Sequence, residues 1–249
     1  MQLSDYASFC QLAYRATPDQ GEREYGEWVA PYLRSMGAEL VEFLDRGGTQ
    51  GYVVKIPGEG LLIAFRGTEL SSVQDLRMNL SAAWHGVGYS RAAKCHLGFH
   101  LACDHVFSRI LAVLADEDPG VLHITGHSLG AGVASVCAER LSRSGRTPNY
   151  LVTFGSPRVG NRSFARSIST RMVVHRVVNG IDPVPYFGRG VHPPSLVYLD
   201  SQGVHVSPGP IRLWSSVLSQ TFGSCLSFRF CRDRFSAHKI TSYQRSLRV

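Results

Sequence analysis

The residues best suited to chemistry lie in HITGHSLGAGVAS, residues 123–135, where one serine stands between two glycines. An apolar run that predicts a strand ends just before Gly126, and a helix-like run begins at Leu129, so the chain must bend sharply between them. Gly126 and Gly130 lack Cβ atoms and let strand and helix crowd together. In this context G-x-S-x-G predicts a nucleophile elbow that presents the Ser128 hydroxyl at the carboxyl end of a sheet.

A serine hydroxyl needs a base that accepts its proton, here a histidine oriented by a carboxylate. In elbow proteins the chain order is Ser, Asp, His. Asp182, in VVNGIDPVP, follows an apolar run and is the preferred acid, whereas Asp200 better fits a turn. Three histidines follow: His192 precedes two prolines, His205 alternates within a short strand, and His238 precedes a C-terminal helix. Chain order alone favours His238.

Acyl transfer also needs N–H donors for the developing oxyanion. The residue after the serine, Leu129, supplies one. IAFRGTEL, residues 63–70, reads as a buried strand that ends in a tight turn, and there Thr68 offers both its N–H and its hydroxyl as a second donor.

The elements that must position these residues alternate between strands and helices. Helices are expected over residues 3–15, 22–36, 99–115, 129–143, 162–169 and from about 238. Strands are expected over 121–125, 149–154, 171–179, 195–200 and 203–207, with a hairpin whose two strands are joined by residues 57–60. This order predicts an α/β fold with a mostly parallel central sheet, helices on both faces, and a single domain over residues 1–249.

The composition fits a globular protein: the 249 residues are 44% hydrophobic and 18% charged. No unbroken apolar run approaches the roughly 20 residues of a membrane-spanning helix. The start, MQLSDYASFCQLAY, does not resemble a secretory signal, which leaves open retention inside the cell or export by another route. The net charge is +7, and residues 226–249 carry six basic side chains against one acid. This excess forms either a solvated tail or a surface for anionic lipid; nothing indicates nucleic acid.

Six cysteines are scattered along the chain without a CxxC pair, so zinc binding is not expected. Cys10, Cys95, Cys103 and Cys137 read as free core residues. Cys225 and Cys231 are close enough in sequence to pair in an oxidising compartment.

Five motifs, in order, resemble the class 3 lipases, the family of fungal triacylglycerol lipases and their bacterial relatives. They are AFRGT (64–68), CHLGFH (95–100), ITGHSLGAGVAS (124–135), TFGSPRVGN (153–161) and RVVNGIDPVP (176–185). The resemblance implies an α/β-hydrolase fold and hydrolysis of lipid carboxylic esters through an acyl-enzyme, without a metal or cofactor.

Carried over to this sequence, the resemblance implies that Ser128 is the nucleophile, Asp182 the orienting acid, and Thr68 and Leu129 the oxyanion donors. It also favours His238 as the base, because AHKITSY (237–243) is similar to the family's histidine segment, which has a tyrosine a few residues on. His192 resembles a loop histidine that the family does not use as the base.

Two segments are candidates for a lid or an interfacial element. Residues 208–232 have no clear counterpart in the family, and Ile211, Trp214, Val217, Leu218 and Phe222 recur there at helical spacing. The family's usual lid region corresponds to residues 69–94, with Leu80, Trp84 and Val87. We expect one of them to cover the site in water, although a helix docked on the core is the simpler interpretation of 208–232.

The sequence leaves several alternatives open. The protein is a triacylglycerol lipase-like or plain carboxylesterase, a phospholipase A-type enzyme acting on membrane phospholipids, a peptidase or thioesterase on the same scaffold, or a lipase-like binding module without catalysis. A complete set of Ser, Asp and His argues against the last. The oligomeric state is not predicted.

Overall fold

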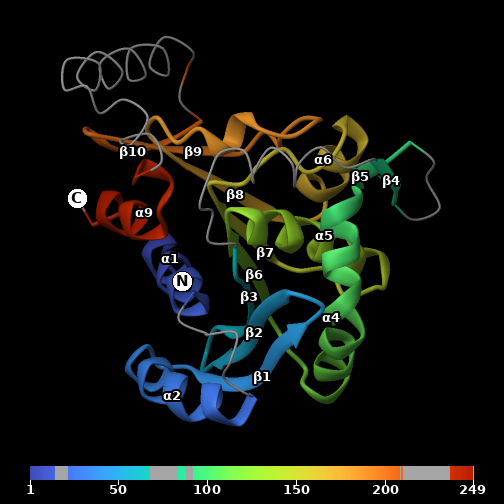
Figure 1. Ribbon diagram of the computed structural model, residues 1–249, viewed down its shortest axis with the longest axis vertical. Helices are drawn as coiled ribbons and strands as arrows, with labels where there is room; N and C mark the ends of the chain where they lie inside the picture. The colour runs from blue at the N-terminus through green and yellow to red at the C-terminus, as the bar shows by residue number, and fades with distance from the viewer. Residues whose placement is uncertain (15–21, 68–83, 88–91, 208, 210–235, 249) are drawn as a thin grey trace.

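The computed structural model of the chain describes residues 1–14, 22–67, 84–87, 92–207, 209 and 236–248. Its centre is an eight-stranded sheet in the order β1-β2-β3-β6-β7-β8-β9-β10 (Figure 1). The strands are β1 (Glu39–Arg46), β2 (Thr49–Ile56), β3 (Gly60–Phe65), β6 (Leu122–His127), β7 (Tyr150–Phe154), β8 (Val173–Asn179), β9 (Leu196–Asp200) and β10 (Gly203–Val206).

The middle of the sheet is parallel and its edges are antiparallel. Neighbouring strands from β3 through β6, β7 and β8 to β9 pair in parallel. Antiparallel pairs join β1 to β2, β2 to β3 and β9 to β10. Because parallel strands end at one edge, the loops that follow β3, β6, β7 and β8 converge there, where ligands bind in open α/β sheets.

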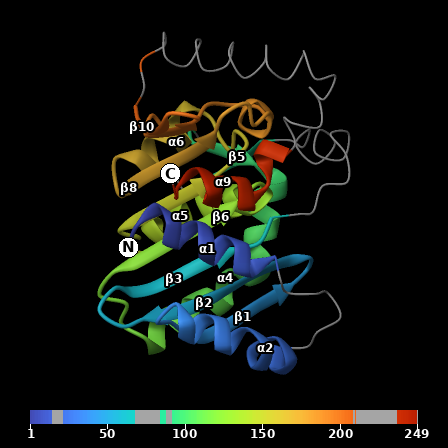
Figure 2. The ribbon, with the colours of Figure 1, turned by 90° about the vertical axis from the view of Figure 1, so that its left-hand side faces the viewer.

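Helices cover both faces of the sheet. On one face lie α4 (Leu97–Asp116), α5 (Leu129–Arg143) and α6 (Arg162–Ser169); on the other lie α1 (Leu3–Ala13), α2 (Glu22–Ser35) and α9 (Ile240–Ser246). Figure 2 shows α1 and α9 side by side in front of the sheet, although they come from opposite ends of the chain.

Strand β3 shows why its sequence is a continuous apolar run. Ile63 and Phe65 point into the core under α4 and α5, whereas Leu62 and Ala64 point into the core under α1. A strand buried on both faces has no polar side to display.

The fold confirms the predicted α/β class, the parallel centre of the sheet and the hairpin, which is formed by β2 and β3. Helices α5 and α6 have the predicted bounds. The sequence did not predict β1, whose exposed positions carry charged side chains and which forms the edge of the sheet. It also did not predict the small hairpin of β4 (Trp84–Gly86) and β5 (Lys94–His96).

Helix α4 is long and apolar enough to cross a membrane by length and composition, with a mean hydropathy of 1.3. It packs against α5 and the sheet, and it contributes Phe99, Val106 and Ile110 to the core. Core helices of globular proteins have this composition too.

Most of the two proposed covering segments lies outside the described residues. Of residues 208–232, only Gly209 is described. Leu80 in the segment 69–94 also lies outside the described residues, as do five apolar residues of the other segment: Ile211, Trp214, Val217, Leu218 and Phe222. Of the rest of 69–94, Trp84 is half-buried and Val87 belongs to the core. The lid hypothesis and the single-domain boundaries stay predictions.

The cysteine prediction is confirmed for the described residues: Cys10, Cys95, Cys103 and Cys137 are free and buried. Cys225 and Cys231 lie outside the described part of the chain.

Candidate active site

The bend at Ser128 is as sharp as the sequence requires. Ser128 has φ 58° and ψ −127°, and of the described non-glycine residues only it and Ser207 have a positive φ. This conformation costs free energy for a residue with a Cβ, and it persists where the surrounding packing imposes it. A Cβ on Gly126 would lie 2.4 Å from the carbonyl oxygen of Gly130. Strand and helix therefore touch through backbone, as the two glycines predict.

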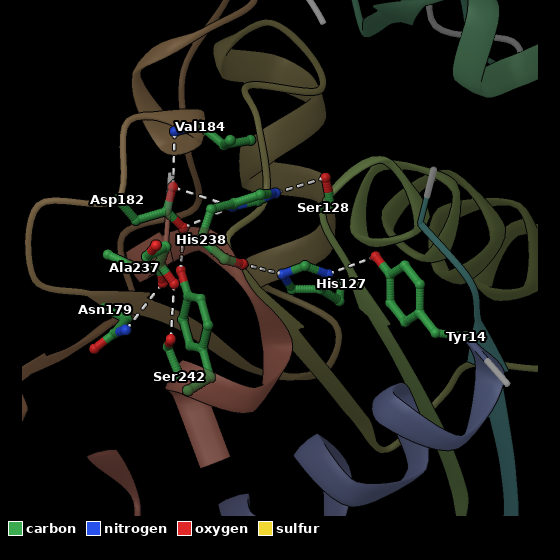
Figure 3. Close-up of polar contacts among 11 residues, drawn as sticks. Tyr14, His127, Ser128, Asn179, Asp182, Val184, Ala237, His238 and Ser242 are labelled. Carbon is green, nitrogen blue, oxygen red and sulfur yellow. Dashed lines mark hydrogen bonds and ion pairs between the residues drawn. The ribbon is translucent and has the colours of Figure 1, made fainter. Parts of the chain in front are cut away.

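Three predicted residues from distant parts of the chain meet at this bend (Figure 3). Ser128 Oγ lies 2.8 Å from His238 Nε2, and His238 Nδ1 lies 2.9 Å from one carboxylate oxygen of Asp182 and 3.1 Å from the other. Ser128 follows β6, Asp182 follows β8, and His238 precedes α9. All three are buried, Asp182 completely.

The buried carboxylate of Asp182 accepts hydrogen bonds from three groups. Besides His238, the backbone N–H of Val184 donates to it at 2.9 Å, and the hydroxyl of Tyr243 donates as well. Burial first, and then the Asp182 charge, hold the pKa of Tyr243 well above its usual value, so the phenol keeps its proton. Hydrogen-bond donors of this kind interact more strongly with a carboxylate than with a neutral carboxyl group.

These contacts fix the direction of the hydrogen bonds at His238. A carboxylate only accepts, so Nδ1 carries the proton toward Asp182. In a neutral ring, Nε2 is then a bare acceptor facing the Ser128 hydroxyl. This is the protonation state that a general base needs before it takes the serine proton.

Part of the predicted oxyanion site lies next to Ser128. Leu129 begins α5, and the first N–H groups of a helix have no partner within it. Gly67, two residues after the end of β3, packs against the elbow: a Cβ at this position would lie 3.0 Å from the Ser128 Cβ. Thr68 is the next residue in the chain and lies outside the described residues.

The structure does not bring the other candidate residues to Ser128. His205 on β10 pairs with Asp200 on β9 at 2.9 Å. His192 lies 2.7 Å from the carbonyl of Pro185, and burial together with the neighbouring Arg176 lowers its pKa to about 4.

A cavity of about 230 Å³ opens beside the start of α5. Its apolar side chains come from both α4 and α5: Phe99, Ala102, Leu129 and Val133. The polar side chains of Thr49, Arg66 and His96 line the same cavity, which reaches the elbow at Leu129 and Gly130.

Sequence reasoning missed two residues of this region, His127 and Tyr14. The sequence placed His127 beside the serine and gave it no role. In the structure it is buried between Tyr14 and the backbone of His238. The only signal was a histidine directly before the serine, at the end of a strand that also contains His123 and Thr125, and nothing in the sequence pointed to Tyr14 as its partner.

With the geometry established, comparison with known proteins identifies the family. The family model described as Lipase (class 3) matches residues 62–189, just over half of the chain. The chain belongs to the class 3 lipase family. The matched part contains Ser128, Leu129 and Asp182, whereas His238 lies beyond it.

Relatives and solved structures agree with this membership. The chain is 31% identical over 186 residues to a secreted mono- and diacylglycerol lipase A of Penicillium cyclopium, covering 72% of this chain and 57% of that lipase. The chain therefore spans less than two thirds of that relative's length. The crystal structure of a mono- and diacylglycerol lipase from Aspergillus oryzae matches with a TM-score of 0.67 and 25% identity, covering 84% of this chain and 87% of the other. The crystal structure of a lipase from Rhizopus microsporus var. chinensis has a TM-score of 0.65 and shares the fold at 23% identity, covering 82% of this chain and 75% of the other.

Proposed function

We propose that this class 3 lipase family member is a serine esterase that hydrolyses carboxylic esters of lipids through an acyl-enzyme. The observation that carries the proposal is the continuous chain of hydrogen bonds from Ser128 through His238 to Asp182. Serine, histidine and aspartate in this arrangement are the parts of a hydrolase triad.

The proposed reaction follows from the bonds. His238 Nε2 accepts the proton of the Ser128 hydroxyl as Oγ attacks the ester carbonyl, and Asp182 stabilises the imidazolium that forms. The N–H of Leu129 and the donors of Thr68 bind the oxyanion. His238 then protonates the leaving alcohol, and a water molecule activated by the same histidine releases the acid.

Acylglycerols are the proposed substrates. The names of the Penicillium and Aspergillus relatives favour mono- and diacylglycerols, and the apolar part of the cavity beside Leu129 has room for part of an acyl chain. The net charge of +7 favours anionic phospholipid as the alternative ester. A panel of monoacylglycerol, diacylglycerol, triacylglycerol and phospholipid, measured with the wild-type protein, separates these substrates.

The decisive variant is Ser128→Ala. We expect turnover of a short p-nitrophenyl ester to fall by at least about 10³-fold, and labelling by a fluorophosphonate probe to disappear, because no other group replaces the nucleophile. Ser135→Ala is the matched control: Ser135 is a buried serine of α5, the helix that Ser128 precedes, and its hydroxyl donates to the Ala131 carbonyl. Labelling that persists in Ser128→Ala, or a wild-type protein inert to every ester, would contradict the proposal.

A further inference from the structure

Two tyrosine–histidine pairs join α1 and its C-terminal capping residue, Tyr14, to β6. The Tyr6 hydroxyl lies 2.6 Å from His123 Nδ1, and the Tyr14 hydroxyl lies 2.6 Å from His127 Nδ1. One pair lies at the start of the strand and the other at its end, immediately before Ser128. The same pair of side chains is thus used twice between the same two elements.

The two pairs differ in what the far side of the imidazole holds. His123 Nε2 lies 3.1 Å from the backbone carbonyl of Glu59, in the hairpin between β2 and β3. His127 Nε2 lies 2.6 Å from the backbone carbonyl of His238 (Figure 3). Only the second pair reaches a residue of the proposed triad.

The bonds at His127 have one consistent direction. A carbonyl oxygen only accepts, so Nε2 donates to the His238 carbonyl. Burial, followed by the neighbouring His238, keeps the pKa of His127 well below its ordinary value, and the ring is therefore neutral. A neutral ring that is protonated on Nε2 accepts at Nδ1, so the Tyr14 hydroxyl donates. Tyr14 thereby selects the tautomer that holds the His238 backbone.

The segment that carries His238 is held by side chains at three successive carbonyls. Ser242 Oγ donates to the carbonyl of Ser236 at 2.7 Å, Asn179 Nδ2 to that of Ala237 at 3.0 Å, and His127 to that of His238 itself. The three donors come from α9, β8 and β6. The last is the shortest bond and acts on the residue whose ring faces Ser128.

We propose that Tyr14 and His127 are positioning residues for His238, so that helix α1 sets the geometry of the proposed catalytic base. This inference rests on the proposed esterase function for its kinetic consequence, although its structural consequence is independent of turnover. The imidazole of His238 is hydrogen-bonded to Asp182 and Ser128 and lies against the His127 ring at 4.7 Å between centroids, whereas its backbone carbonyl is held by His127 Nε2. Without that donor, the buried His238 carbonyl loses its partner and the segment is free to shift away from Ser128.

The test compares two single-atom deletions, Tyr14→Phe and Tyr6→Phe. Each removes one tyrosine–imidazole hydrogen bond of the same length from the same helix. We expect both to lower the melting temperature to a similar extent. We expect only Tyr14→Phe to lower kcat on a short p-nitrophenyl ester, by about tenfold to 100-fold with little change in KM, because small displacements of a catalytic group have effects of this size.

A second pair of variants acts on the imidazole itself. His127→Gln keeps an N–H able to reach the His238 carbonyl, whereas His127→Leu does not. We expect His127→Gln to retain more of kcat than His127→Leu, and both corresponding changes at His123 to leave kcat within about twofold of the wild type. A higher kcat in His127→Gln than in His127→Leu would show that the hydrogen bond to the His238 carbonyl matters, and not only the volume of the imidazole.

Proton NMR of the wild-type protein and the two tyrosine variants gives a readout that needs no substrate. The hydrogen bond from His238 Nδ1 to Asp182 should produce a strongly downfield proton resonance, which Tyr14→Phe shifts or broadens and Tyr6→Phe leaves in place. An unchanged resonance in Tyr14→Phe overturns the positioning role, even if the protein proves not to be an esterase. A protein that lacks esterase activity but shows the expected change in the resonance contradicts the proposed function alone. Equal losses of kcat in Tyr14→Phe and Tyr6→Phe also overturn the proposal, because they indicate a general effect on the fold.

Discussion

Among the three side chains of the proposed triad, that of Asp182 has hydrogen bonds to the largest number of different groups. It is fully buried and accepts hydrogen bonds from His238, Val184 and Tyr243. An ionised carboxylate in a protein interior is stable only when such donors are present. Tyr243 is therefore part of the electrostatic support of the triad, and it acts through its hydrogen bond to Asp182.

At this scale we predict the effect of Tyr243→Phe. Loss of a charge-assisted hydrogen bond to a buried carboxylate should cost about 2 kcal/mol of unfolding free energy and lower kcat by about tenfold. Urea unfolding and p-nitrophenyl ester kinetics measure the two effects. Tyr52→Phe is the control, because the Tyr52 hydroxyl is also buried but donates to the Phe9 carbonyl at 2.5 Å, away from the triad. A Tyr243→Phe enzyme with full kcat would contradict the support role.

At the scale of elements, the elbow depends on how closely β6, α5 and the end of β3 approach. A Cβ on Gly130 would lie 2.5 Å from the Arg66 carbonyl oxygen, and one on Gly126 would lie 2.4 Å from the Gly130 carbonyl oxygen. Both contacts are with backbone, which cannot rotate away as a side chain can. The two glycines are therefore requirements of packing, separate from the positive φ that Ser128 itself adopts.

We accordingly predict that Gly126→Ala lowers the free energy of unfolding by about 2 kcal/mol or more, since overpacking at a backbone contact forces strand and helix apart. The displacement also moves Ser128, so esterase activity should fall together with stability. Gly86→Ala is the matched control: a Cβ at Gly86 meets nothing within 4 Å. Chemical denaturation of both variants decides the matter, and equal stabilities would show that the junction tolerates a methyl group.

The elements that the sequence predicted are those with a strong local pattern. The doubly buried strand β3, the small-residue helix α5 and the elbow between β6 and α5 carry their signal within a few residues. Strand β1 has no such local signal, because charged residues such as Glu39 and Asp45 occupy its exposed positions. It forms a strand because it pairs with β2.

The site likewise contains residues that the sequence predicted and residues that it did not. Ser128, Asp182 and His238 were accessible through chain order and family resemblance. The Tyr14–His127 pair was not, because it joins residues 113 positions apart, and only the packing of α1 on the sheet makes them neighbours.

On the scale of the whole molecule, histidines whose pKa is lowered by partial or full burial make the fold sensitive to acid. In the described part of the chain, burial lowers the pKa of His100, His123, His127, His175 and His192. Unfolded histidine titrates near 6.5, so below that pH the unfolded chain binds more protons than the folded one. Stability is therefore complete above about pH 6.5 and falls as the pH drops toward the folded values.

The pKa of His192 allows the acid-induced loss of stability to be estimated for one residue. Its pKa in the fold is about 4, so between about pH 6.5 and 4 it should contribute a loss of about 3 kcal/mol of unfolding free energy. His192→Gln keeps a donor for the Pro185 carbonyl but does not titrate, and it should flatten the fall by that amount. Urea unfolding at pH 7, 5.5 and 4 measures both curves. Parallel curves for wild type and variant would show that His192 does not titrate in this range.

The contacts between α1, β6 and the start of α9 have one more consequence. The side chains that form and support the proposed triad come from positions 14 to 243, and no short stretch of the chain holds two members of the triad. A partly assembled sheet therefore has no residual site. Loss of turnover during denaturation should mark the disappearance of the native state as faithfully as any spectroscopic signal.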